Sequence, residues 1–155
     1  MRLCRLLCFV TAVAVLGFAP APLPRKERTG KRDDMEVLQG VWRMTYQESG
    51  GSPSGHDFKA RIRGDRWTFI HIAQGNESES IGYHLTLDQT VSPRAMEWAY
   101  DKNRTSGWVA SYRIEGKKLT VVYTSGTLKN DRDRRPTSFT GQVPHKMIFE
   151  YVGRE

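Results

Sequence analysis

Two histidines offer the first chemistry to consider, because neutral imidazole is a common zinc ligand. His71 and His84 lie in segments that we expect to pair as neighbouring strands, and Asp88 follows on the second of them. The sequence does not fix the register between these strands, and neither a third histidine nor a helical His-Glu-x-x-His motif completes a ligand set. We therefore predict no metal site and treat both histidines as ordinary strand residues.

Paired carboxylates are the second candidate chemistry. Glu97 and Asp101 would form an acid/base pair only if both faced one cleft at a set separation, which their spacing along a strand and its following loop does not show. Asp131 and Asp133 resemble part of a calcium loop, but arginines alternate with them and no glycine or distal glutamate follows at the required spacing. No serine stands in a Gly-x-Ser-x-Gly motif. We predict no catalytic residue, no cofactor and no enzymatic activity.

Aromatic side chains are the sequence feature that is most informative about function. An eight-stranded barrel has an interior just wide enough to be filled by side chains or to hold one small ligand. Because bulky rings consume the space that a ligand needs, we favour a filled interior, while a ligand cavity lined by these rings remains the alternative. The candidate lining residues, all in expected strands, are Trp67, Tyr83, Trp108, Tyr112, Tyr123 and Phe149.

Alternation of apolar and polar residues predicts the strands that carry these rings. It is clearest over residues 108–114, and the tight turn Glu115-Gly116 leads into a second alternating strand. Gly64-Asp65 turns a second hairpin, and residues 74–80 form the loop of a third. The pattern predicts eight strands in total, at residues 41–48, 58–63, 66–73, 81–88, 95–100, 108–114, 119–123 and 146–152.

These strands predict one fold class. An antiparallel sheet of this length must close or fold over to protect its edges, and no window sustains a helical apolar pattern for three turns. A single helical turn from Met35 to Leu38, capped by Asp34 and ended by Gly40, precedes the first strand. We expect an all-β domain over residues 34–155, with residues 125–144 as a solvated loop.

The first 21 residues have the layout of a secretory signal peptide. Arg2 and Arg5 precede an apolar stretch that is too short for a membrane span of about 20 residues. Cleavage after Ala14, Ala19 or Ala21 remains open, as does an uncleaved N-terminal anchor. Residues 22–33, rich in proline and charge, read as a flexible basic tether. We predict export to the periplasm, the cell envelope or the medium.

Charge and cysteine counts change once the leader and tether are set aside. Seven of the 24 basic and one of the 17 acidic side chains precede Asp33, so 17 basic and 16 acidic side chains remain. The basic balance of the whole chain therefore gives no support to a nucleic-acid partner. Cys4 and Cys8 both lie in the leader, so we predict a cysteine-free mature domain that is stabilised by its core alone.

Five short motifs recur together in a family that this chain resembles. They are the segments Leu38 to Trp42, Arg63 to Asp65, Tyr83 to Asp88, Tyr112 to Leu119 and Arg135 to Phe139. In this order they resemble an uncharacterised domain family multiplied in planctomycete bacteria, which is considered lipocalin-like. The resemblance implies a single antiparallel eight-stranded lipocalin-like barrel with a short N-terminal helical turn, and it implies no activity.

Gly40-x-Trp42 also looks like the glycine-x-tryptophan of lipocalins, in which the indole closes one end of the barrel. That similarity nominates Arg154 to cover the ring through a cation–π contact, and a simple core aromatic is the alternative. Alternation places Trp42 on one face with Met44 and Tyr46. We expect Trp98, near the end of a less certain strand, to contribute less to stability than Trp42.

Two functions remain open. The barrel is either a non-enzymatic module that binds a small apolar or amphipathic ligand, or a structural or protein-interaction module of the cell envelope with a filled interior. We predict no nucleic-acid partner and no stable membrane span unless the leader stays uncleaved. The oligomeric state does not follow from the sequence.

Overall fold

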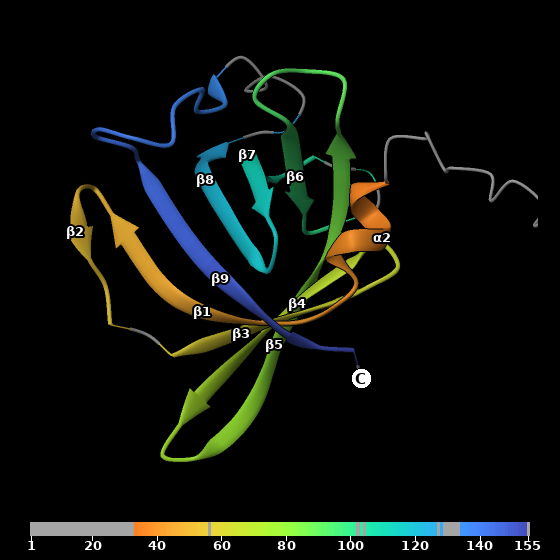
Figure 1. The fold of residues 1–155 in the computed structure, drawn as a ribbon, viewed down its shortest axis with the longest axis vertical. Helices are drawn as coiled ribbons and strands as arrows, with labels where there is room; N and C mark the ends of the chain where they lie inside the picture. The colour runs from red at the N-terminus through yellow and green to blue at the C-terminus, as the bar shows by residue number, and fades with distance from the viewer. Residues whose placement is uncertain are drawn as a thin grey trace, which may run out of the picture. The chain divides into compact units, whose positions relative to one another are not determined.

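A single antiparallel sheet forms the domain, and the chain is described here by a computed structural model over residues 33–55, 57–101, 103, 105–126, 128 and 134–154. The sheet runs in the order β2-β1-β3-β4-β5-β6-β7-β8-β9, and β9 pairs back onto β1, so eight strands close a barrel while short β2 extends β1 (Figure 1). The predicted fold class is confirmed. The elements are α2 (Asp34–Leu38), β1 (Gly40–Ser49), β2 (Ser52–Pro53), β3 (Phe58–Arg63), β4 (Arg66–Ala73), β5 (Asn76–Asp88), β6 (Ala95–Ala99), β7 (Gly107–Glu115), β8 (Lys118–Gly126) and β9 (His145–Gly153).

The predicted leader and most of the predicted tether lie outside the described residues. Within the part of the chain that is described, no helix is both long and apolar enough to cross a membrane.

The hairpin between β4 and β5 differs from the prediction. Gln74 and Gly75 both adopt positive φ, 53° and 80°, and turn the chain in two residues. Residues 76–80, expected in a loop, therefore continue β5, and residues 76–79 pair with β4. Their polar sequence hides the strand, but the outer face is stabilised by ion pairs such as that between Lys59 and Glu77. The long hairpin projects beyond the rest of the barrel (Figure 1).

The segment after β8 is anchored to the barrel at several points, which corrects in part the prediction of a solvated loop, although most of its described residues are exposed. Arg135 donates from Nη1 to the carbonyl oxygen of Pro93 over 2.8 Å and also to Ser111 Oγ on β7. Leu128 and Val143 are buried. The Arg-Pro-Thr-x-Phe motif thus fastens this segment to the outer wall, while Asp131 and Asp133 lie outside the described residues.

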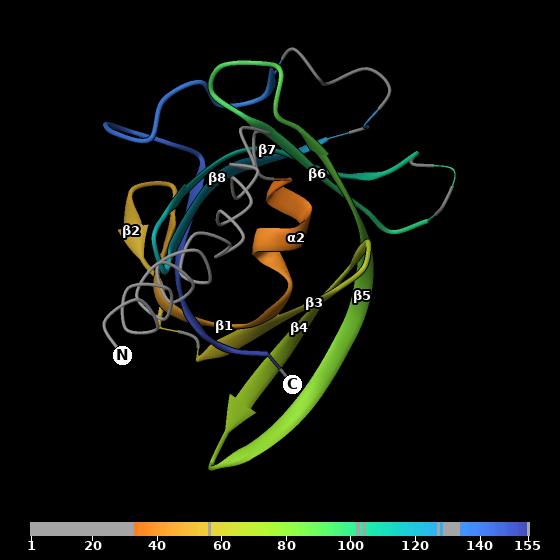
Figure 2. The ribbon, with the colours of Figure 1, turned by 45° about the vertical axis from the view of Figure 1, so that its right-hand side comes forward.

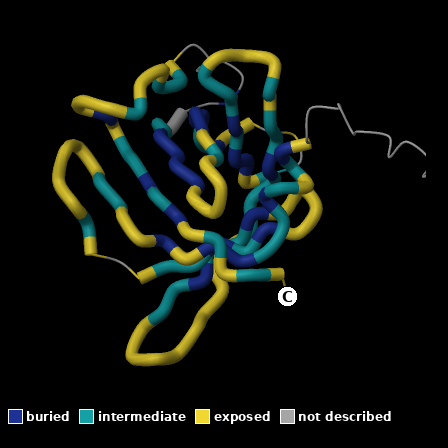
Figure 3. Tube along the Cα trace, viewed as in Figure 1, coloured by how far each residue is buried: buried dark blue, intermediate teal, exposed yellow. Residues whose placement is uncertain are grey.

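Large rings fill the middle of the barrel. Trp67, Trp98 and Phe149 are each at most 1% exposed, and the Trp67 ring centroid lies 5.1 Å from that of Trp98 and 5.6 Å from that of Phe149. Buried positions alternate with less buried ones along β3 and β9, whereas residues 109–112 of β7 and 119–122 of β8 are buried on both faces (Figure 3). The preferred reading of the sequence, a side-chain-filled interior, therefore describes the middle of the barrel.

Helix α2 closes one end, and Figure 2 shows it projected within the ring of strands. Its N-cap is Asp33, whose Oδ1 accepts the Met35 backbone N–H over 3.0 Å, and not Asp34 as predicted. Asp34 is instead 5% exposed, and its Oδ2 accepts hydrogen bonds from Tyr112 Oη at 2.7 Å and Arg94 Nη1 at 2.6 Å. A buried carboxylate with two donors thus ties the helix to β7 and to the residue before β6.

Trp42 lies under this helix. Its indole N–H donates to the Leu38 carbonyl oxygen over 2.8 Å, and the Tyr151 ring meets its edge at 5.1 Å. The chain passes from helix to strand at Gly40, where φ is +121° and an added Cβ would lie 2.5 Å from the Gly153 carbonyl oxygen. Both the backbone conformation and this close approach require glycine there.

Trp98→Ala should destabilise the domain as strongly as Trp42→Ala, contrary to the ranking expected from the sequence. Both rings are 1% exposed, and replacing a buried tryptophan with alanine costs about 3–5 kcal/mol. Ile81→Ala, at a side chain that is 67% exposed, is the control and should change the free energy of unfolding by less than about 0.5 kcal/mol. Chemical denaturation measures all three, and a Trp98→Ala cost below about 1 kcal/mol would refute a packed middle layer.

Alkaline pH should weaken the domain partly through Tyr112. Burial, and then the hydrogen bond to the Asp34 carboxylate, raise the pKa of Tyr112 above its ordinary value. A raised folded-state pKa gives stability that is complete below the unfolded value of about 10 and is lost as the pH rises above it. The stability advantage of wild type over Tyr112→Phe should therefore shrink by about 1 kcal/mol between pH 10 and 11. Denaturation curves at both pH values check this, and an unchanged advantage would contradict it.

Candidate functional site

A hollow of about 300 Å³ lies at the end of the barrel away from α2, and we call it the aromatic cup. Strand β7 runs from Trp108 at the cup to Tyr112 beneath the helix, and β9 runs from Met147 to Tyr151 in the same sense. The filled middle layer therefore forms the floor of the cup. Its walls come from seven strands and comprise Met44, Gln47, Phe58, Phe69, Ser80, Tyr83, Trp108, Tyr123 and Met147.

The six rings predicted as cavity lining divide between three levels of the barrel. Tyr83, Trp108 and Tyr123 line the cup. Trp67 and Phe149 belong to the buried middle layer. Tyr112 lies at the α2 end and binds Asp34 there. Alternation placed these rings on strands, but it could not assign their levels, because strand register decides that.

The rings at the cup contact one another mostly at inclined angles. The centroid of Tyr83 lies 5.1 Å from that of Trp108 and 5.1 Å from that of Tyr100, whose side chain is 45% exposed at the rim. On the other side Tyr123 stacks on His145 at 4.9 Å. Ring edges and faces at these distances are the surfaces that aromatic ligands pack against. The cup can therefore bind a flat apolar group.

The cup disfavours negative charge. Burial raises the pKa of Tyr83, with a further contribution from its neighbour Tyr100, and burial also raises the pKa of Tyr123. Both phenols stay neutral at physiological pH, because the surroundings solvate a phenolate poorly. The same surroundings would oppose the entry of an anionic group.

A β-bulge in β1 supplies the polar group of the cup. The pairing with β9 shifts register between Met44 and Tyr46, so Tyr46 turns outward and is 37% exposed, whereas alternation predicted that it would face inward with Trp42. Gln47 lines the cup in its place, and its Oε1 is buried without a hydrogen-bond partner among the described residues. Strict alternation along β1 places Gln47 on the outer face, because the extra residue of a bulge leaves no signal in the apolar–polar pattern.

Two further polar atoms are unsatisfied behind the wall of the cup. The indole nitrogens of Trp67 and Trp98 are buried and have no acceptor within the described residues. Both rings pack against Phe69, which lines the cup, at centroid distances of 5.6 and 6.4 Å. Unpaired buried donors are costly, so the interior retains hydrogen-bonding capacity that the protein itself does not use.

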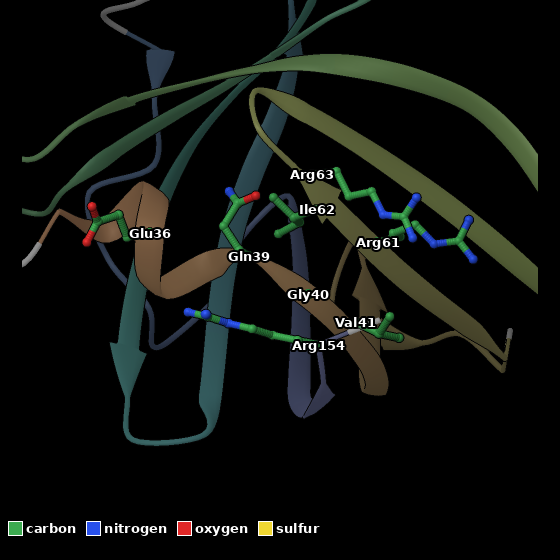
Figure 4. A pocket seen from close by; sticks show the side chains of 8 residues that line it. All are labelled: Glu36, Gln39, Gly40, Val41, Arg61, Ile62, Arg63 and Arg154. Carbon is green, nitrogen blue, oxygen red and sulfur yellow. The ribbon is translucent and has the colours of Figure 1, made fainter.

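A second, larger hollow of about 460 Å³ lies outside Gly40 beside α2. Figure 4 shows Arg61 and Arg63 on one side and Arg154 extending in another direction, so their guanidinium groups do not converge on one point. Arg61 pairs with Glu79. The amide of Gln39, at the same hollow, is bound on both its oxygen and its nitrogen. This hollow is larger than the cup but assembles no receptor for an anion.

Arg154 lies at this outer hollow, whereas the indole of Trp42 meets the edge of Tyr151. The guanidinium found over a ring in the described residues is that of Arg113, 5.0 Å from the centroid of Phe139. The side chain that packs against Trp42 is thus Tyr151, three residues before the predicted Arg154.

The candidate metal and acid/base residues are dispersed. His71 pairs with Ser78 and packs on Phe58, while His84 pairs with Arg66 on the register of β4 and β5. Within the described residues no three metal-binding side chains gather.

The two carboxylates considered as an acid/base pair lie in separate surroundings. Asp101 binds the hydroxyl and backbone N–H of Thr105. Glu97 lines a hollow of about 270 Å³ on the outer wall with Asp88 and Arg135.

Comparison with known proteins gives a structural likeness. No protein-family model matches the chain, and no curated protein matches it. Among solved structures, the chain is similar to apo lipid binding protein 8 of Caenorhabditis elegans, with 13% sequence identity and a TM-score of 0.38 over 76% of this chain and 97% of that one. At this score the likeness carries no argument about function.

Proposed function

We propose that this domain is an exported, non-enzymatic binding module that takes up a small apolar or amphipathic molecule in the aromatic cup. The observation that carries the proposal is the hollow of about 300 Å³ with aromatic and methionine walls at the end away from α2. The signal-peptide layout of residues 1–21 supports export. Membership of the planctomycete lipocalin-like family remains a prediction from the motifs.

Size restricts the ligand. Small-molecule sites usually occupy about 300–1,000 Å³, so the cup lies at the lower end of that range. Trp67, Trp98 and Phe149 block the route further into the barrel. A compact ring system suits this space, and a long extended chain would leave much of its length in water. Removal of apolar surface from water supplies the affinity.

The filled middle layer also favours a second candidate function. A barrel with a packed centre is a rigid scaffold, and its loops can meet another protein of the cell envelope. This structural or interaction module needs no occupant in the cup. Binding of a small apolar probe to the cup distinguishes the two candidates.

Titration with N-phenyl-1-naphthylamine, a neutral apolar dye, tests the proposal. We expect saturable binding that raises the dye's fluorescence and the melting temperature of the protein, because a ligand that binds the folded state stabilises it. Ser80→Phe should reduce the affinity at least tenfold, since Ser80 lines the cup and lies at an exposed position that tolerates a larger side chain.

Ser52→Phe is the matched control, because it adds the same ring at an exposed position of β2 outside the cup lining. It should leave the affinity unchanged. Equal binding by wild type and both variants would place the dye elsewhere, and absence of saturable binding would favour the interaction module.

A further inference from the structure

We propose that the cup selects neutral ring-containing amphiphiles that carry a hydrogen-bond donor, such as a hydroxyl on an aromatic or alicyclic ring, and that Gln47 is the residue that recognises this donor. The inference rests on the proposed function and specifies the chemical class of its ligand.

The backbone of Gln47 is held from both sides. Its Cα pairs with Met147 on β9, and its carbonyl oxygen accepts the backbone N–H of Ser54 over 2.9 Å. The bulge between Met44 and Tyr46 sets which residue of β1 faces inward at this level. Bulges are commonly found where a side chain must be aimed at a functional site. The backbone position from which the Gln47 side chain reaches the cup is therefore fixed by the barrel.

The Gln47 Oε1 atom is a buried acceptor that has no partner in the part of the chain that the structure describes. A ligand that donates one hydrogen bond satisfies it once the flexible amide turns its oxygen toward the cup, whereas an apolar ligand of the same shape leaves it desolvated and unpaired. Sites with a buried polar group discriminate strongly against analogues that lack the complementary group, because the group then stays unsatisfied. The acceptor thus favours a hydroxylated ring over its hydrocarbon parent.

The surroundings of the acceptor exclude a carboxylate as the favoured polar group. An anion presents lone pairs to Oε1 and donates no hydrogen bond. Tyr83 and Tyr123, which line the cup, occupy surroundings in which a buried phenolate is disfavoured. Both effects act against an anionic ligand and leave neutral donors as the better match.

Three probes that share one ring system separate these contributions: naphthalene, 2-naphthol and 2-naphthoate. Their dissociation constants at pH 7 are measured by quenching of tryptophan fluorescence and by displacement of N-phenyl-1-naphthylamine. We expect 2-naphthol to bind about tenfold more tightly than naphthalene, and 2-naphthoate to bind more weakly than naphthalene.

Gln47→Leu keeps the approximate size of the side chain and removes the acceptor. In this variant 2-naphthol and naphthalene should bind equally, with the affinity for naphthalene no weaker than in wild type. Gln142→Leu, at an exposed position outside the cup lining, is the matched control and should keep the tenfold preference. Melting curves of both variants verify that they are folded.

Two outcomes would overturn the inference while the proposed function stands: equal affinity of wild type for naphthalene and 2-naphthol, or a preference that survives Gln47→Leu. Tighter binding of 2-naphthoate than of 2-naphthol would likewise contradict a neutral ligand class. Failure of all three probes to bind would instead overturn the proposed function, and the inference with it.

Discussion

The antiparallel pairing of β1 with β9 is the constraint on which the rest of this structure depends. It joins the first and last strands of an eight-stranded sheet and so removes the unpaired edges that an open sheet would present. At one end this pairing places Trp42 opposite Tyr151, and at the other it places Gln47 opposite Met147. The closed end and the cup are therefore positioned by a single strand pair.

The same pairing contains the irregularity that separates the two ends in chemistry. From Trp42 to Met44 the strand alternates, so that Trp42 and Met44 are buried on either side of exposed Arg43. The register shift after Met44 then reverses the facing of the next residues, so that an amide enters the cup where a tyrosine would have stood. A filled, hydrogen-bonded end and an aromatic cup with an unsatisfied acceptor result from one inserted residue.

The hollow beside α2 is larger than the cup, but volume alone does not make it the better candidate site. It lies outside Gly40, where the Gln39 amide is already bound and the arginines point apart (Figure 4). The cup is smaller, yet its walls combine contacting rings with a buried polar atom that has no partner among the described residues. This unused hydrogen-bonding capacity in an apolar surrounding makes the cup the better candidate for a binding site.

Alternation and turn residues predicted the barrel well, because apolar and polar residues alternate along a strand that buries only one face. They failed where the conformation depends on turn geometry, ion pairs, a distant hydrogen bond or a bulge. Residues 76–80 are polar on both faces, and their strand depends on the Gln74-Gly75 turn and on ion pairs with β3. The roles of Asp34 and Gln47 depend on a partner far away in the chain and on a bulge, and neither leaves a local signal.

The levels of the six predicted rings were equally hidden, because they follow from the registers of strands that meet only after folding. Alternation identified these rings as candidates, and the registers between neighbouring strands from β4 to β9 then assigned each one to the cup, the middle layer or the closed end. The sequence therefore identified side chains that line the site, but it did not predict where in the barrel the site lies.

The central claim is that a small neutral ring binds in the cup and nowhere else in the barrel, and the four tryptophans report on it directly. Each indole N–H gives one resonance in a 15N-labelled protein, so titration with 2-naphthol is followed at four known depths. The account predicts that the resonance of Trp108, at the cup, shifts strongly, while that of Trp42, bound to the Leu38 carbonyl oxygen at the closed end, stays in place. A shift of Trp42 that equals or exceeds that of Trp108, or no shift of Trp108 at saturation, would contradict it.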